Sequence, residues 1–341
     1  MPPLPVPTRR RWLALAGGLL AAPLWPGVGH ARPSQPLFGT PVDLLLPAPL
    51  PAGAEAAVWQ GLARIHHGWN AWKPGALLAL NQALRAGQGT TVAPALRRVL
   101  QQAAALESAS DGCFNPAIGG LVGAWGFHAD RLQPGPRPAA SVLAPWQAAA
   151  PSLADLHWQG DRVHSRNPAV QLDLGAIGKG VAIDQALDDL QRRGASAALL
   201  NLGGNLAVMG APGGRPWQVG IRHPMRPGLL ATLATAGRES VVTSGSYERF
   251  RLVDGAPAVH ILDPQRGAPV PARATATALV SVTVVHPSAA LADAAATALL
   301  VAGPARWPAI AQRLGVDQVL VVDAQGRARA SPALAPRLHW A

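Results

Sequence analysis

Cysteine is almost absent from this chain, since Cys113 is the only one among 341 residues. A single thiol cannot form an intramolecular disulfide, and it excludes a metal site built from several cysteines. Because no cysteine lies near the end of the N-terminal apolar run, a lipid anchor at that position is excluded as well. Any metal site must therefore be built from other ligands.

Charged residues are also scarce, at 14%, although the formal net charge is +11. Lys73 and Lys179 are the only lysines, so 27 of the 29 basic residues are arginines, and these are mostly scattered singly among Ala, Gly and Pro. A surface that follows a nucleic-acid backbone needs clustered cations. We therefore attribute the charge to composition and expect no nucleic-acid partner.

No apolar run is long enough to cross a bilayer, which takes about 20 residues. Residues 13–24 are apolar, follow Arg9-Arg10-Arg11 and precede the small-residue site Gly29-His30-Ala31. This order is typical of a secretory signal peptide, and Arg9-Arg10 resembles a twin-arginine export signal, with an ordinary Sec signal as the alternative. We predict a signal peptide at residues 1–31 and one folded domain at 32–341.

Cleavage after Ala31 would leave 310 residues, and removal of Arg9, Arg10 and Arg11 lowers the formal charge from +11 to +8. The expected mature protein is soluble, exported and periplasmic.

Hydrophobic residues make up 49% of the chain, which excludes wholesale disorder, and 36 Gly with 34 Pro argue against a coiled coil. Helical spacing predicts helices at residues 55–67, 75–84, 93–107, 181–193 and 288–301. Short β-type runs predict strands at residues 42–46, 170–173, 197–201, 217–221, 229–233, 240–243, 259–262, 278–285 and 318–322. Residues 130–151 are expected to form a surface excursion. The pattern favours a single large α+β domain with mixed or antiparallel sheets and flanking helices.

The first chemical motif is Asp173, followed by a glycine-spaced turn and Lys179 at the start of a predicted helix. Backbone N–H groups and one cation in this arrangement can bind a phosphate. The spacing fits neither a Walker A loop nor GxGxxG, because Gly180 follows the lysine. A structural strand–turn–helix, with Asp173 as a cap or turn residue, is the alternative.

The second motif is Asp293 with Thr297, four residues apart and therefore on one face of a helix. A carboxylate and a hydroxyl are hard oxygen ligands suited to Mg²⁺. The alternative is a threonine bonded to its own helix and an aspartate stabilised by the helix dipole.

The third motif joins the run Thr243 to Arg249, which contains the single Tyr247, with His260 on a predicted strand. Serine and histidine suggest a hydrolase, but no Gly-x-Ser-x-Gly elbow is present here. A β-turn and a structural histidine remain the alternatives.

These motifs occur in an order that resembles the ApbE family of FAD:protein FMN transferases. The resemblance rests on residues 170–210, "TSGSYERF", "HILDP", "SVTVVHPSAALADAAATALLVAG", "SDGCFNPAIGGLVGAWGF" and Phe38-Gly39-Thr40, and it spans about residues 38–323. It implies an α+β fold and Mg²⁺-dependent transfer of FMN from FAD to a Thr or Ser hydroxyl of an acceptor protein, with release of AMP. Mn²⁺ could substitute for Mg²⁺.

The resemblance also implies roles for single residues. His260 matches the histidine expected to act as general base, which an ordinary pKa near 6.5 would permit. The FAD contacts implied are Phe38, Cys113, Phe114, Asn115, Asp173, Lys179 and Leu262. The metal ligands implied are the side chains of Asp293 and Thr297 and the carbonyls of Ala176 and Ala296.

Four residues depart from the family pattern. Asn115 stands where an aspartate is usual, Gly75-Ala76 replaces Ser-Glu, and Phe38 replaces methionine. The aromatic residue expected over the flavin is Trp69 or Trp72, and the sequence spacing does not decide between them. An FAD pyrophosphatase and a non-catalytic periplasmic flavin-binding protein remain alternative functions. The expected partner of a transferase is a periplasmic or periplasm-facing redox flavoprotein.

Overall fold

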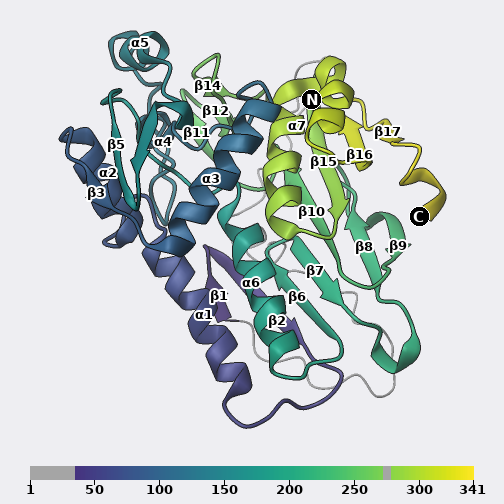
Figure 1. Cartoon of the computed structure of the whole chain (residues 1–341). Coiled ribbons are helices and arrows are strands. Elements are labelled where there is room, and N and C mark those ends of the chain that lie inside the picture. Colours follow the sequence, from purple (N-terminus) through teal and green to yellow (C-terminus); the bar gives the residue numbers. More distant parts are fainter. Residues whose placement is uncertain (1–34, 272–277) are drawn as a thin grey trace.

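The computed structural model describes residues 35–271 and 278–341, which form an α+β fold (Figure 1). The predicted signal peptide at residues 1–31 lies outside the described residues. The helices are α1 Ala54–Gly68, α2 Ala76–Arg85, α3 Pro94–Ala109, α4 Gly119–Ala124, α5 Ala140–Ala149, α6 Gly178–Arg192 and α7 Ala289–Arg313.

An eight-stranded sheet forms the centre, in the order β1-β2-β6-β7-β10-β15-β16-β17, and every neighbouring pair in it is antiparallel. Its strands are β1 Gln35–Leu37, β2 Thr40–Leu45, β6 Ala198–Leu202, β7 Asn205–Met209, β10 Glu239–Gly245, β15 Leu279–His286, β16 Gln318–Asp323 and β17 Ala328–Ala330.

Both faces of this sheet are covered, so its central strands alternate between two apolar environments. Val242 faces the helical layer that contains α7, whereas the adjacent Val241 packs with β8 Gln218–Arg222, β9 Leu229–Ala234 and β18 Leu338–Trp340 on the other face. Figure 1 shows α6 and α7 lying across the first face. This double coverage buries seven consecutive residues of β15, Leu279 to Val285, and the first four residues of β10.

The remaining strands form small antiparallel sheets near the helical N-terminal half. They are β3 Thr90–Thr91, β4 Leu156–Gln159, β5 Arg162–Ser165, β11 Phe250–Val253, β12 Ala256–Val259, β13 Leu262–Asp263 and β14 Ala268–Pro269. Helix α3 packs against α7, so the two halves share one core.

Helices α6 and α7 touch backbone to backbone near their N-termini. A Cβ added at Gly180 would overlap the carbonyl group of Ala289, so only glycine permits this approach. Asp184 on α6 accepts hydrogen bonds from the Ala289 and Ala290 N–H groups at 2.9 and 3.0 Å and from Ser288 Oγ at 2.9 Å. One carboxylate therefore caps α7 and fixes its start against α6.

Residues 130–151, expected as a surface excursion, are mostly exposed and contain helix α5, which packs Leu143 into a satellite apolar cluster. Two sequence-based predictions of local structure were wrong. Residues 170–173 form no strand, because only Gln171 makes a single bridge, to Ile118. The predicted strand 259–262 is split between β12 and β13, and His260 lies between them.

Within the described residues no helix is both long and apolar enough to cross a membrane.

Candidate active site

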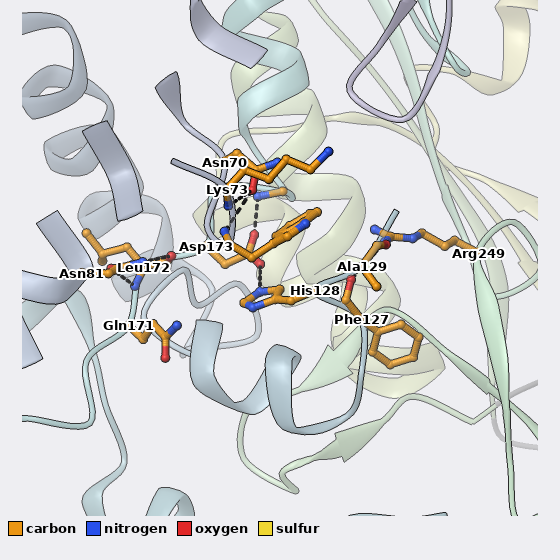
Figure 2. Close-up of polar contacts among 12 residues, drawn as sticks. Asn70, Lys73, Asn81, Phe127, His128, Ala129, Gln171, Leu172, Asp173 and Arg249 are labelled. Carbon is orange, nitrogen blue, oxygen red and sulfur yellow. Dashed lines mark hydrogen bonds and ion pairs between the residues drawn. The ribbon is translucent and has the colours of Figure 1, made fainter. Parts of the chain in front are cut away.

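Asp173 occupies a turn between the bridge at Gln171 and the start of α6, and its carboxylate is held from two sides. Asp173 Oδ1 accepts a hydrogen bond from Gly175 N–H at 2.7 Å, and Oδ2 lies 2.8 Å from His128 Nε2 (Figure 2). The Asp173 N–H donates to Pro116 O at 2.8 Å, and Pro116 directly follows the predicted FAD contacts Cys113, Phe114 and Asn115. The structure thus brings Asp173 close to this stretch of the chain.

Burial alone would raise the pKa of Asp173. The hydrogen bond with His128 and the attraction between the two side chains act against burial, and Gly175 N–H and Arg249 add to them. The pKa of Asp173 consequently lies below its ordinary value, and the carboxylate is ionised at neutral pH.

Trp72 is the tryptophan at this carboxylate. Its ring stacks on His128 with the ring centroids 4.9 Å apart and an angle of 18° between the planes. Trp69 instead packs between the two largest apolar clusters. Of the two candidates, Trp72 is therefore the one placed beside Asp173.

Asn81 fixes the backbone that carries Asp173. Its Nδ2 donates to Leu172 O at 2.9 Å, and its Oδ1 accepts from Leu172 N–H at 2.7 Å (Figure 2). A doubly bonded, buried amide replaces the strand pairing that residues 170–173 lack. Asn81, which precedes Leu172 by 91 residues in the sequence, therefore supports the backbone next to Asp173.

Arg249 connects the segment carrying His128 to His260. Its guanidinium donates to Phe127 O and Ala129 O, both at 2.9 Å (Figure 2). Its carbonyl accepts from His260 N–H at 3.0 Å and lies 3.1 Å from His260 Nδ1. Burial lowers the pKa of the Arg249 guanidinium, while the charges of Asp173 and Asp130 act in the opposite direction.

The tautomer of His260 follows from this contact. A carbonyl oxygen can only accept, so Nδ1 must carry the proton and Nε2 is left as an acceptor. Burial, the Arg249 charge and, further away, Lys179 lower the pKa of His260 to about 4. The ordinary value expected from sequence is therefore wrong: the imidazole is neutral at pH 7 and weakly basic.

The second group of predicted residues meets where α6 approaches α7. Gly180 N–H donates to Asp293 Oδ2 at 3.0 Å, and Lys179 Nζ lies 3.6 Å from Asp293 Oδ1. Gly180 is the third residue of α6, so its N–H has no partner within the helix and is available to Asp293, and the first helical bond runs from Val181 N–H to Ile177 O at 3.0 Å. The Ala176 carbonyl therefore lies just outside the helical ladder.

Thr297 lies one turn beyond Asp293 on α7, and its Oγ1 is 3.2 Å from Ser244 Oγ on β10. Ala296 is fully buried within the helix. Carboxylate, hydroxyl and main-chain carbonyl oxygens are the ligands that Mg²⁺ prefers, so the donor set around Asp293 fits a divalent cation. The described residues contain no group of three or more His, Cys, Asp or Glu side chains placed to hold a metal.

Gly175 joins the two groups. Its N–H binds Asp173, and its carbonyl accepts a hydrogen bond from Lys179 Nζ at 3.3 Å. A continuous path of contacts thus runs from Asp173 through Gly175 and Lys179 to Asp293. The structure therefore brings Asp173, Lys179 and Asp293 together through direct contacts.

The other predicted FAD contacts are bonded to, or buried among, other parts of the chain. Asn115 uses its amide internally, donating to Pro151 O at 2.9 Å and accepting from Ala117 N–H at 2.8 Å. Cys113 and Phe114 are buried in the main core, and burial raises the pKa of the Cys113 thiol. Leu262 is buried in the cluster beneath β11 and β12.

Phe38 has a left-handed backbone with φ of 54°, and its N–H donates to His66 Nδ1 at 3.1 Å. It lies in the turn between β1 and β2, on the same sheet as the strand that contacts Thr297.

Comparison with known families decides the relationship. The model of the ApbE family matches residues 38–320. The chain belongs to the ApbE family. An FAD:protein FMN transferase of Rhodobacter capsulatus is 41% identical over 340 residues, which cover 97% of this chain and 63% of that protein. The chain thus spans less than two thirds of that relative's length.

Other ApbE relatives cover this chain in sequence and in structure. An FAD:protein FMN transferase of Klebsiella pneumoniae is 34% identical and covers 71% of this chain and 73% of its own. The ApbE protein of Thermotoga maritima superposes with a TM-score of 0.79 at 25% identity, over 89% of this chain and 97% of its own. The flavinyl transferase ApbE of Pseudomonas stutzeri gives 0.76 at 27% identity, over 89% and 95%.

Three residues at this ApbE-like site were missed by the sequence reasoning as functional candidates: His128, Arg249 and Asn81. The partner of each lies at least 45 residues away in the sequence, and the side chains of Arg249 and Asn81 bind only backbone atoms. Contacts of this kind leave no periodic pattern in the local sequence. Arg249 lies within the recognised "TSGSYERF" run, which is the sequence signal that could have pointed to it.

Proposed function

We propose that this protein transfers FMN from FAD to a Thr or Ser hydroxyl of an acceptor protein, with Mg²⁺ as cofactor, and releases AMP. The observation that supports this best is the path of contacts that places a lysine and a metal-competent carboxylate beside Asp173. Relatives that bear the name FAD:protein FMN transferase share most of the chain's length with it.

Different residues would hold the metal, bind FAD and accept the proton. Asp293 and Thr297, with the carbonyls of Ala176 and Ala296, would hold Mg²⁺, or Mn²⁺ in its place, and the cation would neutralise charge on the FAD diphosphate. Lys179 would bind the same diphosphate. Trp72 and Asp173 would orient the rest of FAD, with Asp173 kept ionised by His128.

His260 would accept the acceptor's proton at Nε2. The hydroxyl oxygen then forms a bond to the FMN phosphorus, and the bond from that phosphorus to the AMP oxygen breaks, so that AMP leaves with the electron pair. Arg249 and Lys179, the cations that lower the pKa of His260, would be countered by the anionic diphosphate. Binding of FAD should therefore make His260 a stronger base.

We further propose that the protein is exported and acts in the periplasm. The support is the arginine-rich, apolar N-terminus and its small-residue site. The acceptor would then be a periplasmic or periplasm-facing redox protein.

The direct test mixes the protein, FAD and Mg²⁺ with an exported candidate acceptor and records flavin fluorescence on a denaturing gel. Covalent fluorescence on the acceptor is expected, and it should be absent with Asp293→Asn. AMP release at a rate unaffected by any acceptor would instead indicate an FAD pyrophosphatase. FAD binding without AMP release or transfer would indicate a flavin-binding protein.

A further inference from the structure

Asn205, the first residue of β7, carries a buried amide without a hydrogen-bond partner. The residue is 3% exposed, and its Nδ2 finds no acceptor among the described residues. A buried N–H₂ group that stays unpaired is costly, so such groups in folded proteins call for an explanation, and a ligand is one. The position of Asn205 in the sheet indicates which ligand its amide could reach.

The strand register places Asn205 close to Thr297, one of the predicted metal ligands. Asn205 lies directly opposite Val242 in the β7–β10 pair, and residues opposite each other share a face of the sheet. Ser244, two residues along β10, is on that same face, and its Oγ is 3.2 Å from Thr297 Oγ1. Diagonal neighbours such as Asn205 and Ser244 lie about 7–8 Å apart, a distance that one phosphoryl group bound between their side chains would bridge.

The turn before Asn205 leads toward Phe38. Gly203 and Gly204, with φ of 59° and 97°, form the two-residue turn between β6 and β7. A Cβ at Gly203 would overlap the side chain of Thr40, two residues after Phe38. Asn205 therefore lies between the predicted FAD contact at Phe38 and the predicted metal ligands Asp293 and Thr297.

We propose that Asn205 is an FAD-binding residue whose Nδ2 donates to a phosphoryl oxygen of the FAD diphosphate. This inference rests on the proposed function, which would bring the diphosphate to the cation held by Asp293 and Thr297. Phosphoryl oxygens are acceptors only, which matches the unpaired donor. The diphosphate would supply the partner that the folded chain does not give to Asn205.

The test uses Asn205→Leu, which replaces the amide with an apolar group of the same number of heavy atoms, together with Asn205→Ala. FAD, ADP and riboflavin are titrated separately in the presence of Mg²⁺, and binding is followed by calorimetry. Both variants should bind FAD and ADP roughly 10- to 100-fold more weakly, because a hydrogen bond to a charged group is lost. Riboflavin, which lacks phosphate, should bind as it does to the unchanged protein.

Thermal unfolding separates this role from a structural one. Asn205→Leu should keep or raise Tm, because it replaces an unpaired buried polar group with an apolar one. Ser240→Ala is the matched control: Ser240 Oγ is equally buried and unpaired among the described residues, but it lies at the other end of β10. This control should leave binding of all three ligands unchanged.

Unchanged FAD and ADP affinity in both Asn205 variants would overturn the proposal, as would an equal loss for riboflavin. Failure of the proposed function is a separate outcome, seen when the unchanged protein binds FAD but neither transfers FMN nor releases AMP.

Discussion

His128 Nε2 lies 2.8 Å from Asp173 Oδ2, and the same imidazole stacks on Trp72. One side chain therefore holds both a carboxylate and an aromatic ring of the candidate FAD site. We expect His128→Phe to keep the stacked ring and lose the polar contact, leaving Asp173 with only the Gly175 N–H. The free energy of unfolding should fall by about 1–3 kcal/mol, as measured by urea denaturation at pH 7.

The pH dependence adds a second readout for the same variant. Because the folded-state pKa of Asp173 lies below its unfolded value, its contribution to stability is present above the unfolded pKa and is lost as pH falls through the folded pKa. In His128→Phe the folded pKa rises, so this loss should begin at higher pH. His157→Phe, which alters a histidine whose ring is tilted against that of His164, should not change the profile. An unchanged acid limb in His128→Phe would contradict this account.

Gly180 offers a test of the contact between α6 and α7. A Cβ at this position would meet the Ala289 backbone, so Gly180→Ala should push the helices apart and break the bond to Asp293. A loss of about 1–3 kcal/mol in unfolding free energy is expected, with weaker Mn²⁺ binding measured by electron paramagnetic resonance. The control is Gly61→Ala in α1, where a Cβ has room and should stabilise by up to about 1 kcal/mol.

The lowered pKa of His260 predicts that the stability of the protein changes between about pH 4 and pH 6.5. Its folded pKa of about 4 is below its ordinary value of 6.5, so the unfolded chain binds more protons within that window. The stability that this histidine contributes is complete above pH 6.5 and is lost as pH falls towards 4, by up to roughly 3 kcal/mol. Chemical denaturation across this range should show a shallower slope for His260→Asn. Identical slopes for the two proteins would show that burial does not lower the pKa.

Divalent cations should stabilise the fold through Asp293. At a Mg²⁺ concentration 100 times its Kd, binding should add about 2.7 kcal/mol, seen as a rise in Tm. Asp293→Asn should abolish this rise, while its amide oxygen can still accept from Gly180 N–H. Asp189→Asn is the control, because Asp189 pairs only with Arg192 and Arg193 in the described contacts and lies on the outer part of α6. An equal Tm rise in Asp293→Asn would place the cation elsewhere.

Much of the fold was predictable because it depends on local patterns. Strand β15 is rich in valine, a β-branched residue typical of strands, and the 3.6-residue spacing of α1, α3 and α6 is plain in the sequence. The i, i+4 spacing placed Asp293 and Thr297 on one helix face, and the resemblance to the ApbE family then made them the expected metal ligands. These features require no knowledge of distant contacts.

What the sequence could not indicate depends on distant partners. Residues 170–173 have strand composition, yet Asn81 takes over the hydrogen bonds that a neighbouring strand would supply. The lowered pKa of His260 depends on burial and on Arg249, which only the folded chain brings together. Likewise, Asn205 stands in an ordinary strand sequence, and only the folded chain leaves its buried amide unpaired among the described residues.

The proposed reaction is tested most directly by counting its two products in one time course. The protein, FAD, Mg²⁺ and an exported acceptor are incubated together, and AMP is quantified by chromatography while acceptor-bound FMN is quantified by mass spectrometry. We predict one AMP for each covalently bound FMN, with both absent in Asp293→Asn. AMP without covalent FMN, or neither product despite bound FAD, would contradict transfer to an acceptor protein.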